Sequence, residues 1–197
     1  MSVREKGALI TWTTGRLDAP PVLLLHDRYL DHDANDALGA LLAETRRVIS
    51  VRSARTQMEM GTIKGYYWYL GQLDTPELST LGDALSHLER LLLDIQRETG
   101  RRVTLAGMGE GGALALLIGL LWREHVAGVV SIDGPLAVNI AEMPLTLPPA
   151  NGLPVMLVER QRSLEAAAAA LTGRGATVSS GIAGDPAIAQ WIAALPA

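Results

Sequence analysis

The segment 102–114 constrains the fold of this chain more than any other. Residues 102–108 form an apolar run typical of a buried strand, and 111–123 has the composition of a buried helix. Only a sharp, glycine-rich turn separates the two, with Gly109 at its apex. Such a turn forces its central residue into a strained backbone conformation that glycine accepts more easily than any other residue. The segment therefore predicts a strand, a tight turn and a helix.

Strand-like and helix-like segments alternate along the rest of the chain. The other expected strands are 8–13, 22–26, 48–51, 126–132, 154–159 and 178–183. The other expected helices are 33–47, 81–99, 163–172 and 185–195, with Ser79 or Thr80 as the N-cap of 81–99 and Gly100 as its stop. Segment 52–79 has little periodicity and is expected to be a long loop. Alternation of this kind predicts an α/β fold with a mostly parallel sheet and helices on both faces.

Composition excludes several classes of function. The 197 residues are 48% hydrophobic and 19% charged, which favours a single globular domain spanning 1–197. The absence of cysteine excludes disulfides and a cysteine nucleophile. Net charge is −4 and there is no basic stripe, so no nucleic-acid partner is expected. No uncharged apolar run reaches about 18 residues, and the N-terminus has no signal-like core, so we expect no membrane span and a cytoplasmic location.

Several polar residues and the central turn follow expected strands directly. In parallel sheets the carboxyl ends of the strands meet at one edge, where ligands bind. The expected residues at this edge are His26, Asp27, Gly109, Glu110 and Asp133.

The turn and its surroundings resemble the α/β-hydrolase family, in particular its small phospholipase/carboxylesterase (acyl-protein thioesterase-like) branch. That branch has Gly-Phe-Ser-Gln-Gly-Gly where this chain has Gly107-Met108-Gly109-Glu110-Gly111-Gly112. Leu24-Leu25-His26-Asp27 is similar to its strand ending in His-Gly. Segment 48–52 with Gly65-Tyr66-Tyr67-Trp68 looks like its second strand and aromatic substrate loop, and 154–158 like the strand before its catalytic acid. The resemblance covers nearly the whole chain and implies a single-domain α/β-hydrolase fold.

The same resemblance implies that the catalytic triad is incomplete. In the family a serine attacks an ester or thioester carbonyl, a histidine carries the proton, and an acid orients the histidine. Gly109 stands at the serine position and brings no oxygen. The family's Gly-x-x-Asp turn is replaced by Glu159-Arg160-Gln161-Arg162. The histidine is expected near 184–185, yet no histidine follows His125.

A ligand site remains an expectation of the resemblance. The N–H of Glu110 and an N–H from the Asp27-Arg28 loop are expected to form an anion-binding notch. The ligand would be a small molecule or an acyl-type compound, without a cofactor or a bound metal. The expected ligand-binding residues are His26, Asp27, Arg28, Tyr66, Trp68, Met108, Gly109, Glu110 and Asp133.

Three local patterns each allow more than one interpretation. His26 is either an acid/base group, paired with Asp27 or Glu110, or a holder of loop backbone as in the family. The aromatic cluster 66–69 is a pocket lining, a core contact or a homodimer surface. The run Asp27, Asp31, His32, Asp33 and Asp36 has metal-ligand chemistry, but Asp33 serves equally well as a helix N-cap.

Three functions are therefore in competition. The first is a pseudoenzyme, in which the hydrolase scaffold binds a small molecule or a partner. The second is an enzyme with different chemistry in the same pocket, carried by His26 with Glu110 or Asp27. The third is a carboxylesterase with a relocated triad, for which Ser131 is a poor nucleophile because it lacks a sharp turn and a base.

Overall fold

A twisted eight-stranded sheet forms the centre of the computed structural model, which describes residues 2–142 and 146–196. In spatial order the strands are β1 (Ser2–Lys6), β2 (Leu9–Gly15), β4 (Arg47–Arg52), β3 (Pro21–Leu25), β7 (Val103–Met108), β8 (Val126–Ile132), β9 (Pro154–Val158) and β10 (Thr177–Gly181). The six strands β4, β3, β7, β8, β9 and β10 are parallel, whereas β2 runs antiparallel to both β1 and β4. This confirms the predicted α/β fold with a mostly parallel sheet. Strand β1 was not predicted, because only one apolar residue, Val3, lies in its mostly exposed sequence.

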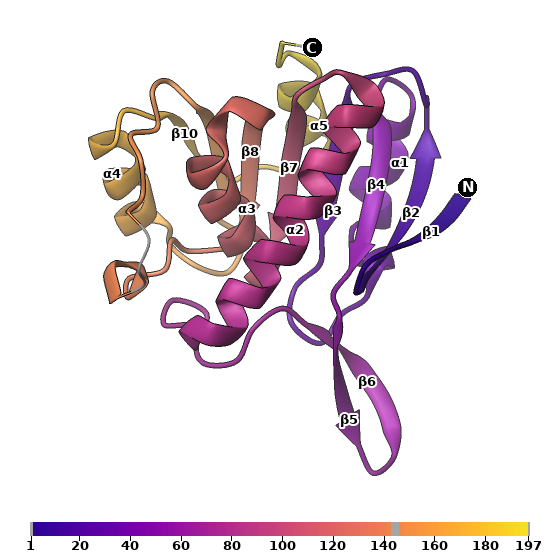
Figure 1. Ribbon diagram of the computed structural model, residues 1–197. Coiled ribbons are helices and arrows are strands. Elements are labelled where there is room, and N and C mark those ends of the chain that lie inside the picture. The colour runs from indigo at the N-terminus through magenta and orange to yellow at the C-terminus, as the bar shows by residue number, and fades with distance from the viewer. Residues whose placement is uncertain (1, 143–145, 197) are drawn as a thin grey trace.

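Helices cover both faces of the sheet, as predicted (Figure 1). Helices α2 (Leu78–Thr99), α3 (Glu110–Leu121) and α4 (Glu165–Gly173) pack on one face, where they bury the larger apolar cluster. Helices α1 (Asp36–Ala43) and α5 (Asp185–Ala193) pack on the other face. Helix α3 is buried along almost its whole length, because α2 covers the side that does not face the sheet.

The ends of α2 test the predicted caps. Gly100 ends the helix in the left-handed conformation (φ 66°), as predicted. The predicted N-cap is wrong: Glu77 caps the helix, and its carboxylate accepts hydrogen bonds from the N–H groups of Ser79 and Thr80. Glutamate is an unusual N-cap, so the preference for serine and threonine at this position placed the cap two or three residues too late in the chain.

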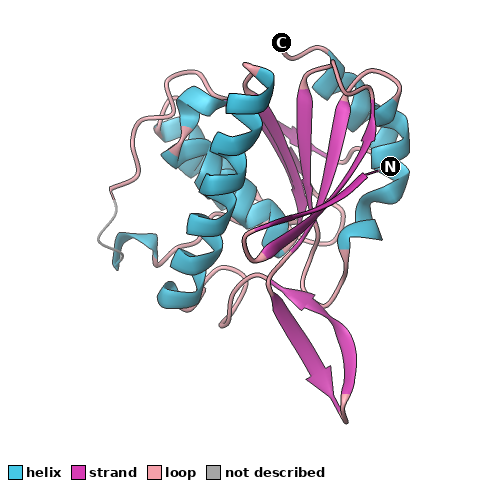
Figure 2. Cartoon of the chain, turned by 45° about the vertical axis from the view of Figure 1, so that its right-hand side comes forward, coloured by secondary structure: helices cyan, strands magenta, loops and turns pink. Residues whose placement is uncertain are grey.

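The predicted long loop 52–79 is wrong over nearly half its length, because 55–67 folds as a β-hairpin. Strands β5 (Arg55–Glu59) and β6 (Thr62–Tyr67) project from the sheet as a two-stranded ribbon (Figures 1 and 2). The two-residue turn Met60-Gly61 has positive φ at both positions, as tight hairpins require. Most of the ribbon is exposed, so its sequence lacks the apolar face that usually marks a strand.

No helix in the part of the chain that the structure describes is long and apolar enough to cross a membrane.

Candidate functional site

The turn between β7 and α3 is a sharp one built on glycine. Gly109 has φ 49° and ψ −113°, and α3 begins at the next residue. Its N–H donates to the carbonyl of Ile132 on β8 (2.8 Å), which fixes the turn at the edge of the sheet. A Cβ on Gly107 would overlap the backbone of Gly111, so glycine also allows the strand and the helix to approach closely.

The side chain of Asp27 lies directly over Gly109. A Cβ on Gly109 would overlap the carboxylate of Asp27, so this carboxylate occupies the space that a side chain on Gly109 would take. Asp27 follows β3, which pairs with β7 in the sheet, and this pairing brings the two residues together. The resemblance places a serine side chain in this same space.

Two backbone N–H groups hold that carboxylate. Oδ1 of Asp27 accepts from the N–H of Glu110 (2.9 Å) and from the N–H of Arg28 (2.7 Å). These are the groups from which the sequence predicts an anion-binding notch. The anion that they bind in this structure is the chain's own carboxylate.

Glu110 joins the turn to the segment that follows β6. Its side chain is fully buried, forms an ion pair with Nε of Arg28, and accepts from the N–H of Trp68 (2.8 Å). Burial raises the pKa of Glu110, against the opposing effects of the Trp68 N–H and Arg28. Arg28 also donates to the carbonyl of Tyr69 (3.2 Å). We call this set of Arg28, Trp68, Tyr69 and Glu110 the clamp.

His26 is fully buried, and both of its ring nitrogens face backbone groups. Nε2 accepts from the N–H of Ser53 (3.1 Å), so Nδ1 carries the proton and donates to the carbonyl of Asp27 (2.7 Å). Trp68 stacks on the ring and donates from Nε1 to the carbonyl of His26 (2.9 Å). Burial lowers the pKa of His26 and favours the neutral imidazole. The geometry is that of a residue holding loop backbone.

A cavity of about 200 Å³ lies beside Gly109. Its lining residues are Asp27, Leu73, Met108, Gly109, Ile132, Asp133, Gln161 and Arg162. Four of the nine expected ligand residues are among them, namely Asp27, Met108, Gly109 and Asp133. Sequence reasoning missed Leu73, Ile132, Gln161 and Arg162. Gln161 and Arg162 carried a signal, because both lie in segment 159–162, where the resemblance expects the family's acid-bearing turn.

The other five expected ligand residues lie outside this cavity. His26, Trp68 and Glu110 are fully buried, and Arg28 pairs with Glu110. The ring of Tyr66 lies against the guanidinium of Arg52 (4.5 Å to the ring centroid). These five residues share one role in the structure, which is to hold the segment after β6 and the base of the hairpin against the rest of the domain.

The aromatic cluster 66–69 divides between two environments. Trp68 and Tyr69 are core residues, which agrees with the core-contact interpretation. The half-buried Tyr66 belongs to the base of the hairpin, where its N–H donates to the carbonyl of Leu30 (3.0 Å). The N–H of Tyr29 donates in turn to the carbonyl of Tyr66 (2.7 Å).

The acidic run near α1 has a structural role at Asp31. Its carboxylate caps the short 3₁₀ helix 32–35, contacts Nδ1 of His32 (2.8 Å), and accepts from Nε of Arg52 (2.7 Å). Burial raises the pKa of Asp31, but hydrogen bonds from Arg52 and His32 outweigh it and hold the pKa at about 2. The proposed N-cap role of Asp33 is wrong, since Asp31 caps this turn and Asn35 precedes α1.

Asp133 lines the other side of the cavity and fixes the start of the segment after β9, where an ion pair also lies. Oδ1 of Asp133 accepts from three successive N–H groups, those of Arg160 (2.8 Å), Gln161 (2.9 Å) and Arg162 (3.2 Å). Arg160 forms an ion pair with Asp185. The resemblance expects the family's acid near 159–162 and its histidine near 184–185, so this ion pair joins the two segments that those residues would occupy.

Together, the sheet order, the tight turn after β7 and the helices on both faces define the α/β-hydrolase fold. Comparison with solved structures agrees. A carboxylesterase from Mesorhizobium loti aligns with a TM-score of 0.77 at 15% identity over 98% of both chains. The Bacillus cereus carboxylesterase aligns with a TM-score of 0.71 at 14% identity, over 93% of this chain and 92% of that one. Arabidopsis thaliana SOBER1 aligns with a TM-score of 0.68 at 18% identity, over 88% of this chain and 97% of that one.

No protein-family model matches the sequence, and no curated protein matches it. The likeness to carboxylesterase structures confirms the predicted fold. At these identities the likeness defines the fold alone. Any statement about chemistry has to come from the residues at the turn.

Proposed function

We propose that this chain is a pseudoenzyme, an α/β-hydrolase-fold protein that lacks the Ser-His-Asp triad and binds a small molecule beside Gly109. The observation that carries the proposal is the carboxylate of Asp27 on the N–H groups of Arg28 and Glu110. In serine hydrolases two such N–H groups form the oxyanion hole, which stabilises the negative oxygen of the tetrahedral intermediate.

An occupied oxyanion hole opposes hydrolysis for two reasons. First, Asp27 engages both donors, and loss of a single donor from such a hole costs on the order of 100-fold to 1,000-fold in rate. Second, the negative charge of Asp27 lies where the transition state would develop its own negative charge. Gly109 supplies no nucleophile that could offset these losses.

The geometry gives no support to chemistry carried by His26. An acid/base group needs hydrogen-bond access to its substrate, but both nitrogens of this buried ring have backbone partners. The carboxylate of Glu110 is also engaged, by its ion pair with Arg28 and by the hydrogen bond from the N–H of Trp68.

A relocated triad also lacks support. Ser131 is fully buried, and its hydroxyl donates to the carbonyl of Gly134 (2.8 Å). Within residues 2–142 and 146–196, no serine hydroxyl is hydrogen-bonded to a histidine. An activated serine nucleophile requires such a base.

Labelling with a fluorophosphonate probe tests this proposal, because the probe reacts with an activated serine. We expect no labelling of the native protein at saturating probe, and no turnover of short-chain p-nitrophenyl esters above the buffer rate. An active serine esterase in the same assay is the positive control. Labelling that disappears on heat denaturation, together with ester turnover, would overturn the proposal.

A further inference from the structure

The size of the cavity beside Gly109 restricts its ligand to a small metabolite. Its volume is about 200 Å³, below the roughly 300–1,000 Å³ of pockets for drug-sized ligands. Leu73, Met108 and Ile132 form its apolar wall, and the other lining residues include three charged ones, Asp27, Asp133 and Arg162. The arrangement of these charges therefore determines the chemistry of the ligand.

Two carboxylates with fixed orientation face the cavity from different parts of the chain. Asp27 follows β3 and Asp133 follows β8. Each uses Oδ1 to accept backbone N–H groups, and in the described part of the chain no hydrogen bond reaches either Oδ2. Backbone hydrogen bonds hold both groups in place, so a second acceptor oxygen on each is available to a ligand.

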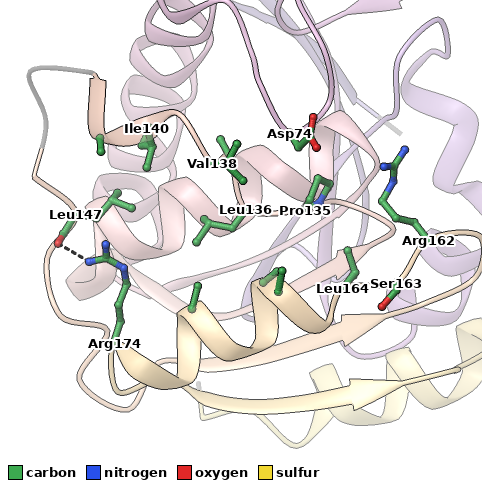
Figure 3. Close-up of a pocket in the computed structure, with 15 residues that line it drawn as sticks. Asp74, Pro135, Leu136, Val138, Ile140, Leu147, Arg162, Ser163, Leu164 and Arg174 are labelled. Atoms are coloured by element: carbon green, nitrogen blue, oxygen red, sulfur yellow. Dashed lines mark hydrogen bonds between the residues drawn. The ribbon is translucent and has the colours of Figure 1, made fainter.

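Arg162 is the one cationic residue among the described residues that line the same cavity. Arg162 is exposed, and its side chain forms no ion pair or hydrogen bond with the described residues. It also lines a neighbouring groove of about 500 Å³ between α4 and the segment after β8, where it lies at the opposite end from Arg174 (Figure 3). Arg174 donates a hydrogen bond to the carbonyl of Leu147 (2.9 Å). Arg162 is therefore the arginine of this groove that can bind a ligand anion.

We propose that the cavity binds a small zwitterion carrying a primary ammonium group and a carboxylate, such as an α-amino acid. The ammonium donates to the carboxylates of Asp27 and Asp133, and the ligand carboxylate pairs with Arg162. A simple anion is disfavoured, because Asp27 already occupies the N–H groups that would bind one. This inference rests on the proposed function, since it assigns a ligand class to the site left without a nucleophile.

Binding of three matched probes tests the ligand class. L-alanine carries both charges, ethylamine lacks the carboxylate, and propionate lacks the ammonium. We expect isothermal titration calorimetry of the full-length protein to give the tightest binding for L-alanine, weaker binding for ethylamine and the weakest for propionate. Absent binding of L-alanine, or binding of either analogue as tight as that of L-alanine, overturns the inference.

Two variants assign the charges to residues. Arg162→Gln should weaken binding of L-alanine about tenfold or more and leave ethylamine unchanged, because only the carboxylate loses a charged partner. Asp133→Asn should weaken L-alanine and ethylamine alike. Arg90→Gln, an exposed substitution on α2, is the matched control and should change neither. Equal binding of L-alanine by native protein and Arg162→Gln would show that the site has been misassigned.

Failure of this inference is distinguishable from failure of the proposed function. Protein that resists the fluorophosphonate probe and does not bind L-alanine retains the non-hydrolytic proposal and loses only the ligand class. Protein that shows heat-sensitive labelling and turns over esters loses the proposed function, whatever the calorimetry gives.

Discussion

Two regions near the cavity, the β3–β7 side and the β9–β10 side, differ in how closely they match the site that the resemblance implies. On the β3–β7 side, the sharp turn at Gly109 and the two converging N–H groups of Arg28 and Glu110 are present. On the β9–β10 side, the Arg160–Asp185 ion pair joins the segments where the resemblance expects the acid and the histidine. The first region therefore has a tight turn with two converging N–H groups, and the second has an arginine–aspartate ion pair.

The difference separates what the fold requires from what the chemistry requires. The turn is fixed by strand pairing, by a backbone hydrogen bond from Gly109 to β8, and by the contact of Gly107 with α3. A different function leaves these packing requirements unchanged. Catalytic side chains at loop ends carry few packing contacts, so they are exchanged without loss of the fold.

The largest expected effect comes from a substitution that breaks the clamp on the β3–β7 side. Glu110→Ala leaves Arg28 and the N–H of Trp68 without their buried partner, which should lower the free energy of unfolding by about 4 kcal/mol. Urea denaturation followed by tryptophan fluorescence measures this change. Glu44→Ala, at an exposed site after α1, is the control and should cost less than about 0.5 kcal/mol. A loss at Glu110 as small as that of the control would show that the clamp does not stabilise the turn.

The second prediction concerns the coupling of Gly109 to Asp27. Gly109→Ser should lower the free energy of unfolding by about 3 kcal/mol, because a Cβ overlaps the carboxylate of Asp27 and the backbone there is strained for a non-glycine residue. Combining it with Asp27→Gly should cost less than the sum of the single substitutions, by about 1–2 kcal/mol. A double-mutant cycle by urea denaturation measures that coupling.

Activity of the same variants tests the β9–β10 side. Neither Gly109→Ser nor the double variant should hydrolyse p-nitrophenyl esters, because no histidine is placed to activate the new serine. Strictly additive stabilities would contradict the proposed steric conflict. Esterase activity in the double variant would show that a base exists near the turn after all.

The repetitive elements of the fold could be predicted from the sequence. Strands β3, β7 and β8 are continuous apolar runs because both of their faces are buried, and such runs are visible without a structure. The turn could also be predicted, because the glycines at 107, 109 and 111 indicate places where a side chain would not fit. Local pattern failed where burial is low, as in the exposed hairpin 55–67.

The electrostatics of the site could not be predicted in the same way. Asp27 and Glu110 are 83 positions apart, and Trp68 and Glu110 are 42 positions apart. No local pattern indicates that one carboxylate fills the notch while the other is buried in an ion pair. The sequence shows the charge of Glu110, which suggests an acid/base partner, but it does not show the hydrogen-bond partners of that carboxylate.

The smallest expected effect is a difference in stability between two ion pairs, one from each side. Arg52 reaches Asp31 through two N–H groups and lies against the rings of Trp12 (4.8 Å) and Tyr66 (4.5 Å), whereas Arg160 reaches Asp185 through one group. Both pairs are partly exposed, so screening reduces their contributions. We expect Asp31→Asn to cost about 1 kcal/mol at pH 7, and Asp185→Asn about half of that.

The pH dependence of the stability lost in Asp31→Asn shows whether this larger loss comes from the charge of Asp31. The folded pKa of Asp31, about 2, lies below the value of about 3.9 in an unfolded chain, so its contribution is full above pH 4. It is lost as the pH falls from about 4 to about 2, because protonation of Asp31 removes its charge in both states. Urea denaturation of native protein and Asp31→Asn at pH 7, 4 and 3 should therefore give stabilities that converge as the pH falls. A difference that stays constant over this range would assign the effect to packing of the side chain, and the ion pairs would then no longer distinguish the two sides of the cavity.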